Sequence, residues 1–310
     1  MPTTGRKKKA TRDYPTSQLL NFARDSYLER TSRPFYATVF LVPFIIFYEI
    51  GTILINTDVL SQYQVRVVAF VWVQDVLLHL GTSSRFAWIA PPLVVVVILT
   101  GLQVAAQKKW YFCWSDYLPM LLECILLAAP LIVLSLLSNS SAAPESHSRA
   151  GSVPPAAQVC LVARPAALSP QQIVSVLGQP STDYPKAHSL MTNIVTGVGA
   201  GIYEELVFRL ILICVLMVLF QDVIGLSRQN AIVLSVLMSA ALFSAHHHIV
   251  WIDGRLARSA PFHWTEFGFR TMAGVYFAIL FAIRGFGITA GTHAFYDIIA
   301  TIVNALFFDH

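Results

Sequence analysis

The chain contains little charge and lacks the signatures of the common hydrolases. Only 12% of its 310 residues are charged, whereas a soluble domain carries about 25%. Its four cysteines include no CxxC pair, which argues against a disulfide framework and a structural zinc site. The HExxH motif of zinc proteases and the GxSxG serine elbow are absent, as is the GxGD motif of intramembrane aspartyl proteases. These absences argue against the zinc-metalloprotease, serine-elbow and paired-aspartate mechanisms.

The chain is rich in long apolar runs. Hydrophobic residues make up 55% of it, and the mean hydropathy is +0.62. A helix needs about 20 apolar residues to cross a bilayer. The composition therefore predicts an all-α fold, a polytopic membrane helical bundle of seven or eight spans. The expected spans are Phe35–Asn56, Phe86–Ala106, Tyr117–Leu137, Leu190–Phe220, Ala231–Val250, Phe267–Ile283 and Gly287–Phe308, with Tyr63–Leu80 as the uncertain eighth.

Polar interruptions divide the chain into four parts. Residues 1–34 form a basic N-terminal segment, which we interpret as juxtamembrane charge on the cytoplasmic side and not as a nucleic-acid-binding arm. Residues 35–138 hold the N-terminal transmembrane helices. Residues 139–189 form a Pro/Ser/Ala-rich extramembrane loop, and residues 190–310 form a transmembrane core. The bilayer is thus an expected partner and nucleic acid is not.

Three features of the N-terminal half and the loop leave alternatives open. Tyr63–Leu80 is apolar but carries Arg66, so it either spans or lies in the interface as an amphipathic helix. Glu49 is interpreted as solvated near an interface, with a supporting place inside the bundle as the alternative. The loop is interpreted as a flexible insertion with one short helix over Pro170–Leu177, and a lid is the alternative.

Charged side chains interrupt the apolar run Leu190–Phe220. Each costs several kcal/mol near the bilayer centre, so an intramembrane charge is by default a candidate for function. Glu205 and Arg209 share a helix face and can pair. Glu204 points about 100° away, which leaves its carboxylate free to face a cavity between the C-terminal helices. Small residues four apart, at Gly197 and Gly201, predict close helix approach beside this site.

Two later apolar segments carry further polar groups. Phe243–His248 ends in three histidines, and His293 and Asp297 are four apart on one helix face. A buried carboxylate can act as a general base toward water, and a histidine can help hold that water or donate to an oxyanion. The combination predicts hydrolysis of an amide by activated water, without a covalent intermediate.

These motifs resemble those of the CAAX protease and bacteriocin-processing family, also called CPBP or Abi. The matching positions are Glu204–Glu205–x–x–x–Arg209, Phe243–x–x–x–His247 and His293–x–x–x–Asp297, in the family's order. The family includes the endopeptidase that removes three residues after prenylation. The resemblance therefore implies an intramembrane glutamate-type peptidase that needs no cofactor.

The resemblance also implies roles for the matching residues. Glu204 corresponds to the catalytic base and His247 to its partner on the water. His293 and Asp297 lie on the oxyanion side, while Glu205 and Arg209 form a structural pair. The best-known eukaryotic members have Asn where this chain has Asp297. An ionised Asp cannot donate a hydrogen bond, so Asp297 is either protonated or orients His293.

Helix lengths place a condition on this site. Glu204 lies ~24 Å from the turn near Phe220, whereas His293 lies only ~9 Å from Gly287, the end of the turn near Gly285, at 1.5 Å per residue. We therefore predict that the turn Arg284–Gly287 lies within the protein and lines a cavity, where irregular backbone is tolerated at membrane depth.

The expected function is hydrolysis of a membrane-associated or lipidated peptide or protein. The expected location is an integral, multi-pass protein in the plasma membrane of a prokaryote, with a cytoplasmic N-terminus. One alternative is a metal-dependent membrane hydrolase with Glu204, His247 and His293 as zinc ligands, whose residue types suit zinc. The other is a non-catalytic scaffold or immunity protein that keeps the motifs for packing.

Overall fold

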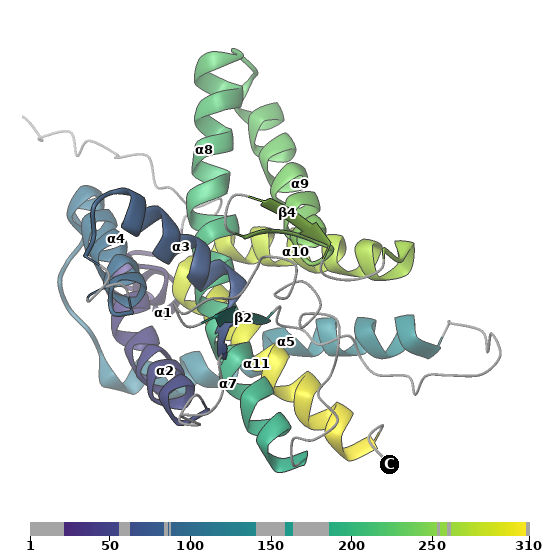
Figure 1. Ribbon diagram of the computed structural model, residues 1–310. Coiled ribbons are helices and arrows are strands. Elements are labelled where there is room, and N and C mark those ends of the chain that lie inside the picture. Colours follow the sequence, from purple (N-terminus) through teal and green to yellow (C-terminus); the bar gives the residue numbers. More distant parts are fainter. Residues whose placement is uncertain are drawn as a thin grey trace, which may run out of the picture.

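The computed structural model describes residues 22–55, 63–83, 86, 88–140, 159–163, 186–252, 255–258 and 262–307. Within these residues the chain is almost entirely helical (Figure 1). Two small antiparallel sheets of two strands each are the described β-structure. The all-α prediction is therefore confirmed, with these sheets as an addition.

The N-terminal half begins with a short capped helix. The Ser26 hydroxyl accepts a hydrogen bond from the backbone N–H of Glu29, and Pro34 opens the next helix, where its missing N–H costs nothing. In chain order the elements are α1 (Tyr27–Thr31), α2 (Pro34–Ile55), β1 (Tyr63–Val67), α3 (Val68–His79), α4 (Ala90–Ala106), the 3₁₀ turn Trp114–Asp116, α5 (Tyr117–Ser140) and β2 (Val159–Ala163).

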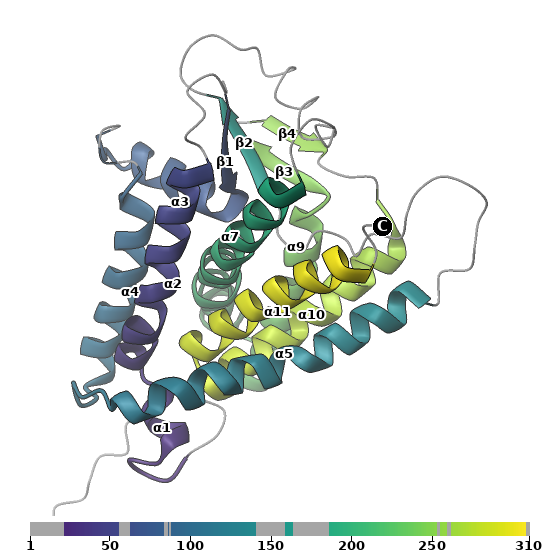
Figure 2. The same cartoon turned by 90° about the horizontal axis from the view of Figure 1, so that it is seen from below.

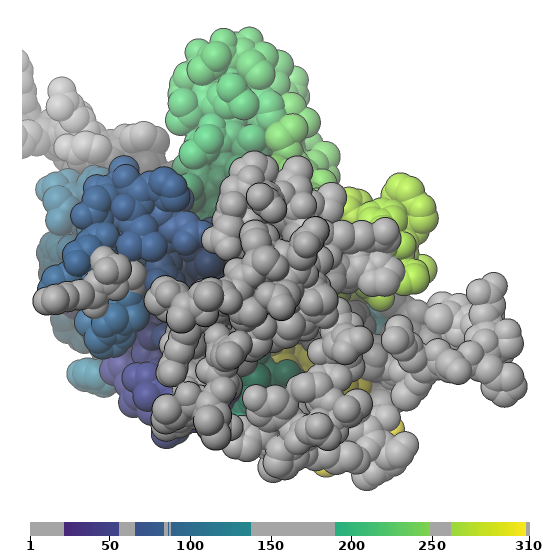
Figure 3. All heavy atoms as spheres, in the orientation of Figure 1, coloured from purple at the N-terminus to yellow at the C-terminus, as the bar shows by residue number. Residues whose placement is uncertain are grey.

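The C-terminal half begins with one long helix that changes its winding twice. Two π-helical segments, Leu206–Leu212 and Val218–Val223, interrupt it. In order the elements are α7 (Lys186–Glu205), α8 (Ile213–Met217) between the π segments, α9 (Arg228–His246), β3 (Ile249–Ile252), β4 (Arg255–Arg258), α10 (Trp264–Arg284) and α11 (Phe286–Phe307). Figure 3 shows the hairpin of α8 and α9 projecting beyond the rest of the molecule.

Six helical stretches in the described part of the chain are long and apolar enough to cross a membrane. They are Pro34–Ile55, Trp114–Leu137, Leu190–Val223, Arg228–His246, Trp264–Arg284 and Phe286–Phe307. α4 was expected to span, but it has only 17 residues. This supports the predicted polytopic bundle, while the total of seven or eight spans and the orientation stay predictions.

Helix α11 lies at the centre of the molecule. It packs against α7, α5, α2 and α10, and 67% of its most apolar window is buried, against 28–39% for the other spans (Figure 2). A Cβ at Gly201 would lie 2.5 Å from the backbone nitrogen of Ala294, and one at Gly197 would lie 2.7 Å from the Asp297 Cβ. The predicted close approach is thus confirmed, and it brings the backbone of α7 beside His293 and Asp297.

Three expectations for the N-terminal half and the loop are corrected. Tyr63–Leu80 is not one continuous helix, because Tyr63–Val67 forms β1 and leaves a helix of only 12 residues, which is too short to span; a place in the interface stays a prediction. The loop 139–189 contributes β2, which pairs with β1 from Tyr63 opposite Ala163 to Val67 opposite Val159. The short helix expected over Pro170–Leu177 lies outside the described residues.

Glu49, the third of these, is bound inside the bundle and not solvated. Its carboxylate accepts from Arg66 Nη1 at 3.2 Å and from the Tyr203 hydroxyl at 3.4 Å. Arg66 also lies over the ring of Phe70, 4.7 Å from its centroid. The two hydrogen bonds to Glu49 tie β1 and α2 to Tyr203, the residue that precedes Glu204.

Candidate active site

Glu204 and Glu205 are the last two residues of α7, where the α-helix gives way to the first π-helical segment. Both side chains are fully buried. π-Helical turns recur at functional sites because they shift the register of the side chains that follow. The Phe208 carbonyl within this segment accepts a hydrogen bond from Ser239 Oγ of α9 at 2.6 Å. α9 therefore stabilises the unusual winding beside the two acids.

The expected pair of Glu205 and Arg209 is present. Arg209 Nη1 lies 3.1 Å from Glu205 Oε1, and Nη2 donates to the Gly274 carbonyl at 3.4 Å. The guanidinium also lies over the ring of Phe243, 4.1 Å from its centroid, which adds a cation–π contribution. The pair thereby joins α7 to α9 and α10.

Glu205 has a second partner that its sequence spacing does not reveal. Its Oε1 lies 2.7 Å from Nδ1 of His293 on α11. Since a carboxylate only accepts, Nδ1 carries the hydrogen and Nε2 points toward Glu204 and Asp297. The Phe277 ring stacks on the imidazole with centroids 4.5 Å apart. Glu205 thus holds His293, a role that the resemblance did not assign to it.

The Glu204 carboxylate lies between imidazoles from two helices. Its Oε1 is 3.7 Å from His246 Nε2, and its Oε2 is 4.0 Å from His293 Nε2. Among the described residues, neither oxygen has a hydrogen-bond partner. A buried carboxylate without partners is costly, because burial removes its water and nothing replaces it. The carboxylate is therefore available to a reactant.

His246 belongs to this cluster, although the motif spacing did not select it. The motif spacing selected His247, but Nε2 of His246 lies 3.7 Å from Glu204 Oε1, and a ring nitrogen of each histidine lies within 4.8 Å of the carboxylate. α9 ends at His246, and His247 follows it as the C-cap. Both side chains are buried. The signal available in the sequence was the run of three histidines at a helix end.

The two histidines share one anchor. Nδ1 of His246 and of His247 lie 2.5 and 2.9 Å from the Phe243 carbonyl oxygen. A carbonyl only accepts, so each Nδ1 carries a hydrogen and each neutral ring presents Nε2 as an acceptor. Both rings can therefore take a proton, or bind a cation, at Nε2.

Asp297 faces His293 but does not hold it. Its Oδ2 is 3.7 Å from His293 Nε2, which is beyond hydrogen-bond distance, and in the described part of the chain its carboxyl has no hydrogen-bond partner. The predicted common face is confirmed. The orienting contact comes from Glu205 instead.

The turn between α10 and α11 lies within the protein, as predicted, while the cavity that it was expected to line stays a prediction. Arg284 and Phe286 are both 5% exposed. Gly285 has φ of +77°, and a Cβ there would lie 2.9 Å from the Ser32 carbonyl oxygen. The turn is thus seated against the N-terminal segment, which sets the depth at which α11 carries His293.

A buried set of acids and imidazoles inside a bundle of apolar helices defines a polytopic membrane protein with a candidate hydrolytic site. Residues 186–299, which contain all of these groups, match the family model described as Type II CAAX prenyl endopeptidase Rce1-like. The match supports the resemblance of this part of the chain to the CAAX protease and bacteriocin-processing family. No curated protein and no solved structure matches the chain significantly.

Proposed function

We propose that this protein is an intramembrane endopeptidase that hydrolyses a peptide bond of a membrane-associated or lipidated substrate with water activated by Glu204. The observation that carries the proposal is the Glu204 carboxylate, which is fully buried and flanked by imidazole nitrogens at 3.7 and 4.0 Å. A base in this setting can take a proton from water while the histidines hold the reacting groups.

The arrangement divides the reaction between two sides. Glu204, with Nε2 of His246 or His247, removes a proton from water as its oxygen attacks the substrate carbonyl. The C–N bond then breaks and the same proton passes to the leaving amine. No covalent enzyme intermediate is needed.

His293 serves the oxyanion side. Carboxyl oxygens of Glu205, Asp297 and Glu204 lie 2.7, 3.7 and 4.0 Å from its ring nitrogens. When the ring is protonated, Nε2 carries a hydrogen as well as Nδ1. In that form Nε2–H can donate to the developing oxyanion. Because Glu205 orients His293, the role left to Asp297 is that of a protonated carboxyl, which can donate to the same oxyanion.

The test is cleavage of an S-farnesylated peptide that ends in a CAAX sequence, with protein purified in detergent. Glu204→Gln removes the base and keeps the shape, so kcat falls by about 10²- to 10⁴-fold. Glu29→Gln makes the same change outside the site and is the matched control. Undiminished cleavage by Glu204→Gln contradicts the proposal. A larger loss with His246→Gln than with His247→Gln identifies His246 as the partner of the water.

A metal-dependent hydrolase is the second candidate. Glu204, His246 and His247 offer ligand atoms within 4.8 Å of one another, a set that differs from the expected one because His246 takes the place of His293. The Nδ1 bonds to the Phe243 carbonyl are the kind of outer contact that fixes metal-binding histidines. Bound at these three residues, zinc would supply an activated water. Activity that resists chelators, together with metal-free purified protein, rules this candidate out.

A further inference from the structure

The candidate active site receives a side chain from the N-terminal half of the chain. Trp72 of α3 packs against the His246 ring in a T-shaped arrangement, with 5.7 Å between the ring centroids. Its ring centroid also lies 6.2 Å from that of Phe208, in the π-helical segment that follows the two acids. α3 therefore forms part of a site whose other groups come from the C-terminal half.

The first turns of α3 are held firmly in the core. Phe70 packs edge-on against the ring of Tyr203, the residue before Glu204, with 5.0 Å between the centroids. The neighbours of Trp72 in these turns are buried, and they are Val68, Ala69, Phe70, Val71 and Val73. Because a helix fixed in this way has one orientation, the direction of the Trp72 side chain is fixed as well.

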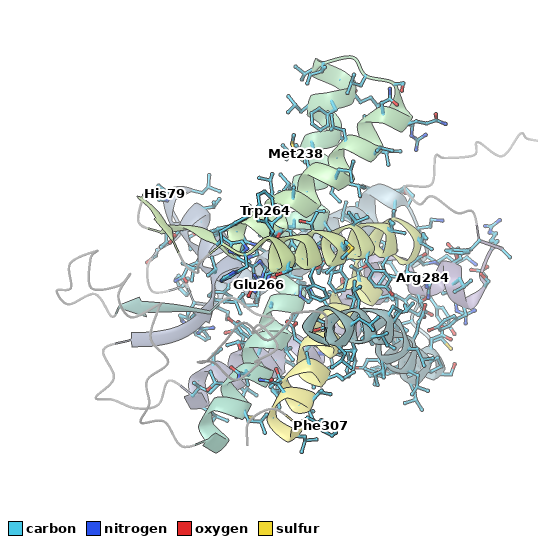
Figure 4. The ribbon with its side chains drawn as sticks, turned by 90° about the vertical axis from the view of Figure 1, so that its right-hand side faces the viewer. His79, Met238, Trp264, Glu266, Arg284 and Phe307 are labelled. Carbon is cyan, nitrogen blue, oxygen red and sulfur yellow. The ribbon has the colours of Figure 1, made fainter. Side chains whose placement is uncertain are left out.

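The end of α9 is fixed from a second direction. Ser244 Oγ donates to the Phe267 carbonyl at 2.8 Å, which joins the end of α9 to the start of α10. In Figure 4, His79 at the end of α3 and Trp264 at the start of α10 lie on the same side of the molecule, away from Arg284. α3 and α10 thus reach the histidine-bearing end of α9 from separate parts of the fold.

The His246 ring requires packing to keep its direction. Its Nδ1 has one hydrogen bond, to the Phe243 carbonyl, and a single bond leaves the ring free to tilt about that atom. Nε2 lies 3.7 Å from Glu204 Oε1, beyond hydrogen-bond distance, and has no hydrogen-bond partner within the described residues. Phe208, with its ring centroid 4.7 Å away, and Trp72 are the aromatic contacts that limit this tilt together with Phe243.

We propose that Trp72 is a positioning residue, which holds the His246 ring so that Nε2 faces the Glu204 carboxylate. The inference rests on the proposed function and adds that the site is incomplete without the N-terminal half. Trp72 acts through His246 and takes no proton itself. Since a small misplacement of a reacting group slows the chemical step more than it weakens binding, the effect of Trp72 is on kcat.

The first test compares cleavage of the farnesylated peptide by variants at position 72. Trp72→Leu removes the ring and keeps an apolar side chain, so kcat falls by about two- to tenfold, the usual worth of an aromatic pair, while KM stays near the wild-type value. Trp72→Phe keeps a ring and recovers most of kcat. Trp88→Leu makes the same change at an exposed tryptophan just before α4 and keeps the wild-type kcat.

A double-mutant cycle shows whether Trp72 acts through His246. In the His246→Gln background the loss caused by Trp72→Leu disappears, because no imidazole remains to be held. In the His247→Gln background the same loss persists. A structural role alone would give equal losses in both backgrounds. Equal losses, or full kcat in folded Trp72→Leu, would overturn the inference.

A spectroscopic readout tests the contact without cleavage. The chain has six tryptophans, so protein labelled with 5-fluorotryptophan gives a simple fluorine NMR spectrum. The signal of Trp72, assigned by its loss in Trp72→Phe, shifts in His246→Gln and shifts less in His247→Gln. A signal that ignores His246→Gln overturns the inference even where Trp72→Leu does not fold. Undiminished cleavage by Glu204→Gln contradicts the proposed function instead, so the two failures are distinguishable.

Discussion

Two polar clusters in this molecule use the same side-chain types in opposite ways. At the end of α10, Arg284 donates to Glu123 at 2.6 and 2.8 Å, to the Leu28 carbonyl at 2.9 Å and to the Thr31 hydroxyl at 2.8 Å. Tyr27 donates to the same Glu123 carboxylate at 2.7 Å. In the active-site cluster, by contrast, both oxygens of Glu204 lack a hydrogen-bond partner within the described residues.

The difference in hydrogen bonding separates a cluster that stabilises the fold from one that is available for a reaction. A saturated cluster stabilises the fold, because each buried polar atom recovers what it lost on leaving water. A buried carboxylate without hydrogen-bond partners lowers the stability of the fold, but its lone pairs remain available to a reactant. The Arg284 cluster joins α1 and α5 to the turn before α11. The Glu204 carboxylate, by contrast, lies between α9 and α11, and His246 Nε2 is 3.7 Å from its Oε1. The comparison therefore predicts that stability and activity respond to different residues.

The largest effect on stability and activity together is expected at Glu205, because it pairs with Arg209 and also holds the candidate catalytic residue His293. Glu205→Gln leaves Arg209 without its counter-charge and weakens the hold on His293. Removing one partner of a buried ion pair costs about 3–5 kcal/mol of unfolding free energy. We expect this loss in equilibrium unfolding in mixed micelles, together with a loss of peptide cleavage. Glu204→Gln, one residue away, is the control and loses cleavage while its stability stays equal or rises.

Breaking the saturated cluster gives the second effect. Glu123→Gln weakens the bonds from Arg284 and Tyr27, so the unfolding free energy falls by about 1.5–3 kcal/mol. Cleavage per folded molecule is unchanged, because Glu123 touches none of the reactive groups. Unfolding curves and initial rates on the same preparation measure both quantities. A loss of cleavage without a loss of stability would show that the contrast between the clusters is wrong.

The sequence predicted the parts of the site that depend on local spacing. Glu205 with Arg209, and His293 with Asp297, are four residues apart, and a helix alone places each pair on one face. Gly197 and Gly201 likewise predicted the close approach of α7 and α11. Short-range geometry therefore gave the membrane bundle and most of the candidate residues.

Contacts between distant segments could not be predicted in this way. Glu205 and His293 are 88 residues apart, and Tyr203 and Glu49 are 154 apart, so their pairing depends on how the helices pack. β1 pairs with a strand from the loop, which no local pattern indicated. His246 was passed over because the end of α9 at that residue decides which histidines face inward.

Ser239 supports the π-helical segment, and its loss is a smaller effect. Ser239→Ala leaves the buried Phe208 carbonyl without the hydroxyl that now donates at 2.6 Å, so the unfolding free energy falls by about 1–2 kcal/mol. Cleavage also decreases, because this segment places Glu205 and Arg209. Ser235→Ala, at a buried hydroxyl of α9 without a hydrogen-bond partner in the described part of the chain, is the matched control and is neutral or stabilising. Equal losses in the two variants would contradict the role of Ser239.

The smallest effect concerns the exposed N-terminal segment and its pH dependence. Hydrogen bonds from Lys109 and then Arg33 lower the pKa of Asp25 from 3.8 to about 2. A carboxyl whose pKa is lower in the folded state stabilises the fold above its unfolded pKa, and this contribution disappears as the pH falls from about 4 to 2. Asp25→Asn should therefore lower the melting temperature slightly at pH 7, and the difference from wild type should vanish near pH 2. Because Asp25 is solvent-exposed, high salt should also shrink the difference at pH 7. A difference that persisted at low pH or in high salt would mean that Asp25 acts through packing and not through its charge.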